Sequence, residues 1–333
     1  MSASTGRLKG QVAIVTGGGG GIGRAEALQL AQEGAKVVVN DLPRGEPTSA
    51  EKVVQEIRNA GGEAVAVNAS VSRMEGAAAI VQAAIDTYGR LDILVNNAGF
   101  GRMAPIWEMT EAEWDSVIAV NLKGSFAMIR HAAAHFRAQG GGVIVNTSSD
   151  AGTGDTYMDG YSAAKEGLVG LTRAVARDLA RDGVRCNAIR PRAFDTGQST
   201  AGGLETHRRF FERFGTTISG RHPLGPAAGT AAEVAAFVAW LCTDAAKSIN
   251  GRIFLIGCGE AALWEEPKIA RAIVRDQPWD LDGLMAQGEA LTQGLLNEPL
   301  ALPDEAWAVL DTRIESHHAH QSARKAGANR EET

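Results

Sequence analysis

The feature that most constrains the fold is a glycine-rich turn, T-G-G-G-G-G-I-G, at residues 16–23. It follows Val12–Val15, a run rich in β-branched residues that is typical of a buried parallel strand. It precedes Arg24–Glu33, which contains good helix formers and no proline and is therefore expected to be helical. Glycine permits positive φ and close approach of a ligand, and the free amides of the following helix face anions. Strand, turn and helix in this order predict a βαβ unit that holds the pyrophosphate of a dinucleotide.

Strand patterns and helix patterns alternate along the rest of the chain. Strands are expected at Val12–Val15, Lys36–Asn40, Ala64–Val67, Ile93–Val95, Gly142–Asn146, Val184–Ile189 and Arg252–Ile256. Helices are expected between them, at residues 22–33, 48–60, 73–88, 111–138, 159–181 and 231–243. This alternation requires crossover connections, which make the strands parallel and place helices on both faces of the sheet. The sequence therefore predicts an α/β fold with a doubly wound, seven-stranded parallel sheet of the Rossmann type.

The domain organisation follows from where this alternation stops. Residues 1–259 are expected to form a single domain. Residues 260–315 read as a helical C-terminal extension, with Trp264 and Trp279 as apolar anchors. Residues 316–333 are polar and are expected to be disordered.

Composition excludes several classes of function. The net charge is −6 with no long basic run, which argues against nucleic acid as a partner. No apolar run approaches the roughly 18 residues of a membrane span, and no N-terminal signal segment is present, so a cytoplasmic location is expected. Reduced thiols suit the three widely spaced cysteines, Cys186, Cys242 and Cys258. No bound metal is expected, because the only clustered histidines lie in the polar tail, at residues 317, 318 and 320.

The choice of cofactor rests on Asp41, which follows the second expected strand. A carboxylate about 20 residues after the turn is placed to bind the adenosine ribose hydroxyls and to repel a 2′-phosphate. NAD is therefore favoured over NADP. Arg44 argues mildly the other way, because a nearby guanidinium can pair with that phosphate.

Tyr161 and Lys165 form the clearest catalytic pattern. They stand four positions apart on an expected helix and therefore share one face. A phenol has an ordinary pKa near 10, too high for a good base at neutral pH. A neighbouring ammonium is expected to lower the pKa of Tyr161, which makes the pair a candidate general acid/base.

Three motifs in order along the chain carry a family resemblance: T-G-x-x-x-G-I-G, then Asn96-Asn-Ala-Gly99, then Tyr161-Ser-Ala-Ala-Lys165. Together they resemble the short-chain dehydrogenase/reductase family over roughly residues 8–259. The resemblance implies cofactor contacts at Gly17, Gly21, Ile22, Gly23, Asp41, Ser70, Val71, Asn97, Ala98, Gly99, Tyr161, Lys165, Pro191 and Thr196.

The resemblance also implies four catalytic residues, which are Asn121, Ser149, Tyr161 and Lys165. Ser149 is the second serine of the family's S-S-x-x-G pattern and would orient the substrate oxygen. Only 12 residues separate Ser149 from Tyr161, about one fewer than in typical members, so Ser148 is the alternative. Lys165 would lower the tyrosine pKa and bind the nicotinamide ribose. Asn121 would kink its helix and hold a water linking Lys165 to solvent.

The sequence departs from the family pattern at several cofactor positions. Ser70 replaces a common aspartate that bonds the adenine, and Val71 would pack on the adenine ring. Arg192 replaces a common glycine just before the segment that would hold the nicotinamide carboxamide. Arg190 and Arg192 either both lie near the site or both face solvent. Gly20 stands where NADP-dependent members often carry a basic residue, which again favours NAD.

The resemblance implies an oxidoreductase that interconverts a secondary alcohol and a ketone by hydride transfer with NAD(H), Tyr161 being the acid/base. An NADPH-dependent 3-oxoacyl thioester reductase is the alternative, and a non-catalytic dinucleotide-binding protein is a third possibility. Residues 197–228 would form the substrate lid, whose phenylalanines and arginines suit either an anionic substrate or a solvated basic face. The extension makes acyl-CoA or steroid-like substrates candidates. A homo-oligomer, most often a tetramer, is expected through the helices at residues 111–138 and 159–181.

Overall fold

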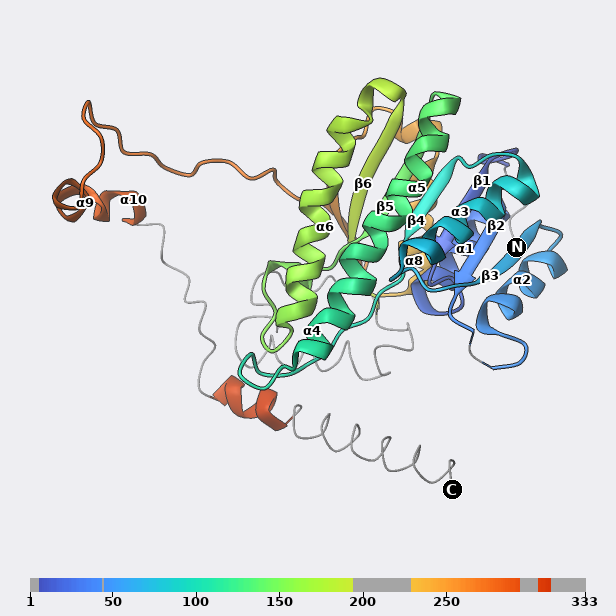
Figure 1. Cartoon of the computed structure of the whole chain (residues 1–333), viewed down its shortest axis with the longest axis horizontal. Coiled ribbons are helices and arrows are strands. Elements are labelled where there is room, and N and C mark those ends of the chain that lie inside the picture. Colours follow the sequence, from blue (N-terminus) through green and yellow to red (C-terminus); the bar gives the residue numbers. More distant parts are fainter. Residues whose placement is uncertain (1–5, 44, 194–228, 294–304, 313–333) are drawn as a thin grey trace. The chain divides into compact units, whose positions relative to one another are not determined.

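The computed structural model describes residues 6–43, 45–193, 229–293 and 305–312 (Figure 1). The chain divides into two compact units, Met1–Leu263 and Trp264–Thr333. Thr196, Arg44, the expected lid at 197–228 and the tail at 316–333 lie outside the described residues.

The first unit is built on one eight-stranded sheet. Its strands are β1 (Val12–Thr16), β2 (Lys36–Asp41), β3 (Ala64–Asn68), β4 (Ile93–Asn96), β5 (Gly142–Thr147), β6 (Val184–Pro191), β7 (Ile253–Gly257) and β8 (Glu260–Leu263). Their order across the sheet is β3-β2-β1-β4-β5-β6-β7-β8. The first seven strands pair in parallel, as the apolar runs predicted.

The eighth strand corrects the expectation of a purely parallel sheet. β8 pairs antiparallel with β7, in a stretch that was expected to be helical. The reversal takes place at Cys258 and Gly259, whose φ values are 58° and 74°. Two successive residues with positive φ form the kind of tight turn that matches the twist of a hairpin. The chain therefore folds back along β7 and closes that edge of the sheet.

Helices cover both faces of the sheet (Figure 1). One core contains apolar residues of α1 (Gly21–Gln32), α2 (Ser49–Asn59) and α8 (Ala231–Cys242). The opposite core contains residues of α3 (Met74–Tyr88), α5 (Gly124–Gln139) and α6 (Asp159–Asp178). Side chains alternate between faces along a strand, so Ala13 and Val15 of β1 enter the first core, whereas Val12 and Ile14 enter the second. This is the doubly wound arrangement that the alternation predicted.

The long helix expected at residues 111–138 is interrupted. It consists of α4 (Glu111–Ile118), a π-helical turn η1 (Ala119–Lys123) and then α5. A π-turn inserts an extra residue into the helical ladder and often marks a functional position. Short 3₁₀ turns are η2 (Asp150–Thr153), η3 (Ala180–Asp182) and η4 (Asp244–Ala246).

The described residues of the second unit contain less regular structure than their sequence suggested. Within residues 260–293, the described first part of the helical extension expected at 260–315, the structure places helices only at α9 (Leu281–Gln287) and α10 (Glu289–Thr292). Asp280 caps α9 by accepting a hydrogen bond from Gly283 N. A further helical segment covers residues 305–312.

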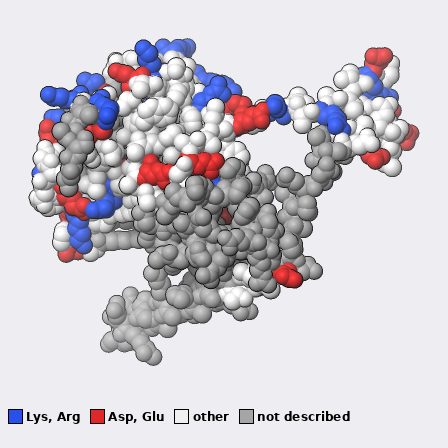
Figure 2. Space-filling model, turned by 180° about the vertical axis from the view of Figure 1, so that it is seen from behind, with Lys and Arg blue, Asp and Glu red and all other residues white. Residues whose placement is uncertain are grey.

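The described surface shows mixed charge. In Figure 2, basic and acidic side chains are interspersed over the described part of this face. Among the described residues, no helix is long and apolar enough to cross a bilayer. In the same ranges, no group of three or more histidine, cysteine or acidic side chains is arranged to hold a metal ion.

Candidate active site

The candidate site lies where the strand order reverses. β1 is flanked by β2 on one side and by β4 on the other, so consecutive connections leave in opposite directions and open a crevice beyond the carboxyl ends of the strands. The glycine turn follows β1, Asn97–Gly99 follow β4, and Ser148–Ser149 follow β5. The sheet thus brings together three motifs that are far apart in the sequence.

The ends of β1 and β4 are joined by a compact set of hydrogen bonds. Thr16 Oγ1 accepts from the amides of Asn97 and Ala98, both at 3.1 Å. Asn97 Nδ2 donates to the carbonyls of Thr16 and Gly17, at 3.0 and 3.2 Å. Gly17 has φ of +63°, and a Cβ on it would lie 2.9 Å from Ala98 Cα. A Cβ on Gly23 would lie 2.3 Å from Gly17 O, so both glycines are required by this close packing.

The front of the turn is open, as a pyrophosphate requires. A Cβ built on Gly20, the N-cap of α1, would meet nothing within 4 Å. Gly21 has φ of +51°, which glycine tolerates without strain. The first turn of α1 contains no acidic residue and its N-cap makes no side-chain bond, so its amides remain for an anion. Ile22 packs behind the turn against the core.

Asp41 reaches the glycine turn from the end of β2. Its Oδ2 accepts from Gly19 N at 3.0 Å, and its Oδ1 accepts from Leu42 N at 2.7 Å. A Cβ on Gly19 would lie 2.5 Å from Asp41 Oδ2. The carboxylate is therefore held beside the turn and keeps acceptor capacity for a ribose hydroxyl.

The two residues expected at the adenine are engaged locally. Ser70 Oγ lies 2.9 Å from Ser72 Oγ and accepts from Ser72 N at 3.3 Å. Val71 is buried, and a Cβ on Gly124 would lie 2.9 Å from its Cγ2. Both residues lie in the turn between β3 and α3.

The two candidate serines have different surroundings. Ser148 is fully buried, and its hydroxyl donates to Lys165 O at 2.7 Å, which ties β5 to the backbone of α6. Ser149 is the N-cap of η2, and its Oγ accepts from Ala151 N at 3.2 Å. The Ser149 hydroxyl also forms a hydrogen bond with the phenol of Tyr161. Of the two serines, Ser149 is the one brought to Tyr161.

Lys165 lies beneath Tyr161 and is almost completely buried. Its Nζ donates to Thr147 O at 2.7 Å and lies 5.3 Å from the centroid of the Tyr161 ring. A Cβ on Gly99 would lie 3.1 Å from Lys165 Nζ and 2.4 Å from Asn121 Oδ1. Only glycine fits at position 99, between these two polar side chains.

Asn121 occupies the middle of the π-turn and is fully buried. Its Nδ2 donates to Val117 O at 2.9 Å and to Phe100 O at 2.8 Å. A side-chain donor thus reaches the carbonyl one turn earlier, which competes with the normal helical bond and explains the local widening. Asn121 Oδ1 is buried with no hydrogen-bond partner among the described residues, so a polar acceptor stands ready close to Lys165.

The pKa values of the catalytic pair differ from the expectation. Burial raises the pKa of Tyr161 to about 12; the Ser149 hydrogen bond opposes this rise, and the charges of Asp150 and Asp155 add to it. Burial lowers the pKa of Lys165 to about 7. The expectation of a lowered Tyr161 pKa is therefore wrong for the protein's own groups. Removal from water disfavours both charged forms, and this outweighs the attraction between them.

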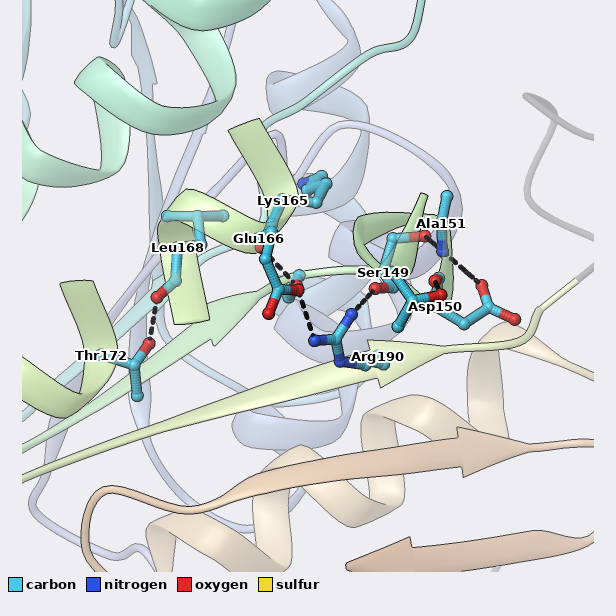
Figure 3. A network of polar contacts seen from close by, with 10 residues as sticks. Ser149, Asp150, Ala151, Lys165, Glu166, Leu168, Thr172 and Arg190 are labelled. Atoms are coloured by element: carbon cyan, nitrogen blue, oxygen red, sulfur yellow. Dashed lines mark hydrogen bonds and ion pairs between the residues drawn. The ribbon is translucent and has the colours of Figure 1, made fainter. Parts of the chain in front are cut away.

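Two arginines that the sequence left without an assigned place contact the loop of Ser149, and Figure 3 shows one of them, Arg190, between Ser149 and Glu166. Arg190 and Arg192 are both buried near the carboxyl end of β6. Arg190 Nη1 donates to Ser149 O and its Nη2 to Glu166 Oε2, both at 2.6 Å. Arg192 Nε donates to Asp150 Oδ2 at 3.0 Å. They face the site and not solvent; the available signal was their i, i+2 spacing at the end of an expected strand.

The remaining cofactor residue of β6 is Pro191. It is the last residue of the strand and stands opposite Ile256 of β7 in the parallel register. The amide of Arg192 still donates to Ile256 O at 2.8 Å, so the arginine does not disturb the backbone where the family commonly has glycine.

Comparisons with known proteins agree with this architecture. A family profile described as "Enoyl-(Acyl carrier protein) reductase" matches residues 17–260. The hydroxyacyl-CoA dehydrogenase ChsB1 of Mycobacterium tuberculosis is 38% identical over 299 residues, covering 86% of this chain and 89% of that protein. The 3-oxoacyl-[acyl-carrier-protein] reductase FabG of Staphylococcus aureus is 37% identical over 248 residues, covering 74% of this chain and 96% of that protein.

A solved structure extends the likeness to three dimensions. The crystal structure of a short chain dehydrogenase from Mycobacterium avium has a TM-score of 0.72 at 37% identity, covering 89% of this chain and 98% of that one. The family match runs from the glycine turn after β1 to the start of β8, and these relatives are oxidoreductases that cover most of the chain. This chain is an oxidoreductase and belongs to the short-chain dehydrogenase/reductase family.

Proposed function

We propose that this protein interconverts a secondary alcohol and a ketone with NAD(H), using Ser149, Tyr161 and Lys165. The observation that carries the proposal is the hydrogen bond between Ser149 and Tyr161 directly above the buried Lys165. Hydroxyl, phenol and ammonium converge at the crevice where the sheet order reverses, which is where α/β sheets bind ligands.

Each residue has a role that its surroundings support. NAD, which the glycine turn and Asp41 would hold, would supply the hydride acceptor for the oxidation. In that direction, Tyr161 accepts the proton of the alcohol. Ser149 donates a hydrogen bond to the substrate oxygen and holds it against the phenol. In the reduction, a pKa near 12 keeps Tyr161 protonated at neutral pH and able to donate to the ketone oxygen.

Lys165 and Asn121 support the proton transfer. The Lys165 ammonium stabilises the phenolate as it forms and is placed to bind the ribose hydroxyls. Asn121 Oδ1, which has no hydrogen-bond partner in the described part of the chain and lies next to Gly99 and Lys165, suits a water that carries the proton towards solvent. Ser149 is favoured over Ser148 as the catalytic serine, because the Ser148 hydroxyl is already bonded to the carbonyl of Lys165.

NAD is proposed as the cofactor because of Asp41. Its carboxylate lies at the glycine turn and would repel a 2′-phosphate while accepting from the ribose hydroxyls. A 3-oxoacyl thioester reductase that uses NADPH is the second candidate, and the likeness to the 3-oxoacyl reductase of Staphylococcus aureus favours it. Initial rates with NADH and NADPH, on secondary alcohols, hydroxysteroids and 3-hydroxyacyl-CoAs and their ketones, separate the two.

We also propose a homotetramer in the cytoplasm. Trp114 of α4 and Phe126 of α5 are partly exposed apolar side chains on helices expected to pair between subunits. Cys186, Cys242 and Cys258 are buried and form no disulfide with any described residue, as is usual in a reducing compartment.

The decisive experiment is Tyr161→Phe. This change keeps the ring and its packing and removes the ionisable hydroxyl, so folding and NAD binding should persist. Turnover should fall by about 10²–10⁴-fold, the usual contribution of general acid/base catalysis. Near wild-type turnover of a true substrate by Tyr161→Phe would place the acid/base elsewhere. Failure of wild type to turn over any member of the panel while binding NAD would favour a non-catalytic dinucleotide-binding protein.

A further inference from the structure

The loop that carries Ser149 leaves the sheet at a point where backbone pairing ends. β5 and β6 pair in register up to Thr147 and Ile189, and Ser148 N still donates to Ile189 O at 2.8 Å. Beyond that bond, the chain turns into η2, and the backbone ladder no longer holds it. The catalytic hydroxyl therefore sits on the first residue after the sheet contact is lost.

The side chains of Arg190, in β6, and of Arg192, directly after β6, continue the attachment where the ladder stops. Arg190 Nη1 donates to Ser149 O at 2.6 Å, and Arg192 Nε donates to Asp150 Oδ2 at 3.0 Å. Residues two apart in extended backbone point to the same face, so both arginines bind the same loop, at the consecutive residues Ser149 and Asp150.

Arg190 also ties the loop to the helix of the catalytic pair. Its Nη2 donates to Glu166 Oε2 at 2.6 Å, and Glu166 directly follows Lys165 in α6 (Figure 3). A Cβ on Gly152 would lie 2.9 Å from Arg190 Nη1 and 3.1 Å from Glu166 Oε2, so η2 packs closely over this pair. One guanidinium thus connects β6, the serine loop and α6.

Both guanidinium groups are engaged in contacts within the protein. Both residues are buried, at 3% and 4% exposure, and each is paired with a carboxylate. Burying a guanidinium is costly unless it is paired and hydrogen-bonded, so these arginines hold their partners in defined positions.

We propose that Arg190 and Arg192 are positioning residues that hold the Ser149 loop in register with Tyr161. We call the contacts of Arg190 and Arg192 with the Ser149 loop the arginine clamp. This inference rests on the proposed function, because it gives the clamp the purpose of maintaining the Ser149–Tyr161 contact. Neither arginine touches the reacting atoms. Each acts by keeping the serine hydroxyl at hydrogen-bonding distance from the phenol.

The first test compares Arg190→Met with Arg185→Met. Methionine keeps much of the apolar stem of arginine and removes its donors. Arg185 is a matched control near the start of the same strand, where it donates to the carbonyls of Leu241 at 2.8 Å and Ile249 at 3.3 Å. Both variants remove an arginine that ties β6 to backbone carbonyls, so a general loss of stability affects both.

Arg190→Met should lower kcat about 10–100-fold more than Arg185→Met does, because an ångström-scale misplacement of a catalytic group costs about that much. The dissociation constant of NAD, measured by fluorescence, should change by less than about threefold, because the glycine turn is untouched. Arg190→Lys keeps one charged donor group and should recover part of the lost kcat. Equal losses of kcat in Arg190→Met and Arg185→Met would overturn the proposal.

The pH profile supplies a readout that mere destabilisation does not move. The groups that affect the pKa of Tyr161 are Ser149, Asp150, Asp155 and Lys165. Of these, only the Ser149 hydrogen bond and the Lys165 cation favour the phenolate. Loosening Ser149 removes one of these two, so the low-pH limb of kcat for oxidation should move to higher pH in Arg190→Met. If Arg190→Met has a reduced kcat but its low-pH limb stays at the wild-type pH, the proposed role of the clamp is contradicted.

Glu166→Ala covers the case in which Arg190→Met does not fold. The Glu166 side chain is half exposed, so its removal is tolerable, and it leaves Arg190 bonded to Ser149 O. Its kcat should fall by roughly 2–10-fold with a limb shift in the same direction; an unchanged kcat and limb would refute the clamp. Tyr161→Phe, assayed in parallel, separates the two ideas. If Tyr161→Phe is active, both the proposed function and this inference are wrong. If Tyr161→Phe is inactive and the kcat of Arg190→Met equals that of Arg185→Met, only this inference is wrong.

Discussion

Glu26 makes the stability of this protein depend on pH in an unusual direction. It lies in α1 and is fully buried, and neither carboxylate oxygen has a hydrogen-bond partner among the described residues. Burial raises its pKa from 4.5 to about 8. The folded protein therefore keeps this carboxyl protonated across a range in which the unfolded chain releases the proton.

The difference between the folded and the unfolded pKa of Glu26 sets the direction and size of the pH effect on the free energy of unfolding. Above the unfolded pKa, the unfolded state binds fewer protons than the folded state, so the free energy of unfolding falls as pH rises. The fall is about 1.4 kcal/mol per pH unit, or roughly 3 kcal/mol between pH 4.5 and 7, and it levels off above the folded pKa of about 8. The stabilisation is thus complete below about pH 4.5 and is lost as pH rises towards 8.

Glu26→Gln removes this dependence, because the amide does not ionise. Urea unfolding at fixed protein concentration, from pH 5 to 8, should show that Glu26→Gln gains on wild type by about 1.4 kcal/mol per pH unit. Glu75→Gln, on the exposed surface of α3, is the matched control and should follow wild type throughout. Parallel curves for wild type and Glu26→Gln would refute the assignment of a protonated buried carboxyl.

Three further predictions concern function and assembly. Asp41→Ala should reduce the preference for NAD over NADP, measured as the ratio of kcat/KM values, because it removes the carboxylate that opposes the 2′-phosphate; a wild type that already prefers NADP would contradict this. Lys165→Met should lower turnover by about 10²-fold or more and move the low-pH limb of oxidation to higher pH, since it removes the cation that stabilises the Tyr161 phenolate; an unmoved limb would exclude that role. Light scattering at micromolar concentration should give the mass of four 34.9 kDa chains, and a monomer would argue against assembly.

Local pattern was sufficient for most of the fold. All seven expected strands occur within two residues of their expected bounds, because a parallel strand buried on both faces is a continuous apolar run in the sequence. The glycine turn was equally readable, since its close packing against Ala98 admits no side chain at Gly17. β8 was missed because Ala261 and Ala262 carry little strand preference, and a hairpin at Cys258–Gly259 determines their conformation.

The details of the site depended on contacts between distant segments. The sequence favoured Ser149 and kept Ser148 as the alternative, because the difference between them lies in what α6 offers to each hydroxyl. It left Arg190 and Arg192 either at the site or in solvent, because the register of β6 beside β5 decides which loop they reach.

The pKa of Tyr161 shows most clearly what the sequence determines and what only the tertiary structure determines. Spacing alone placed Tyr161 and Lys165 on one helical face and suggested a lowered phenol pKa. Burial instead raises the pKa of Tyr161 and lowers that of Lys165. A helical repeat is set by neighbours in the chain and is therefore legible in the sequence. Desolvation is set by every segment that packs around a group, so only the tertiary structure determines it.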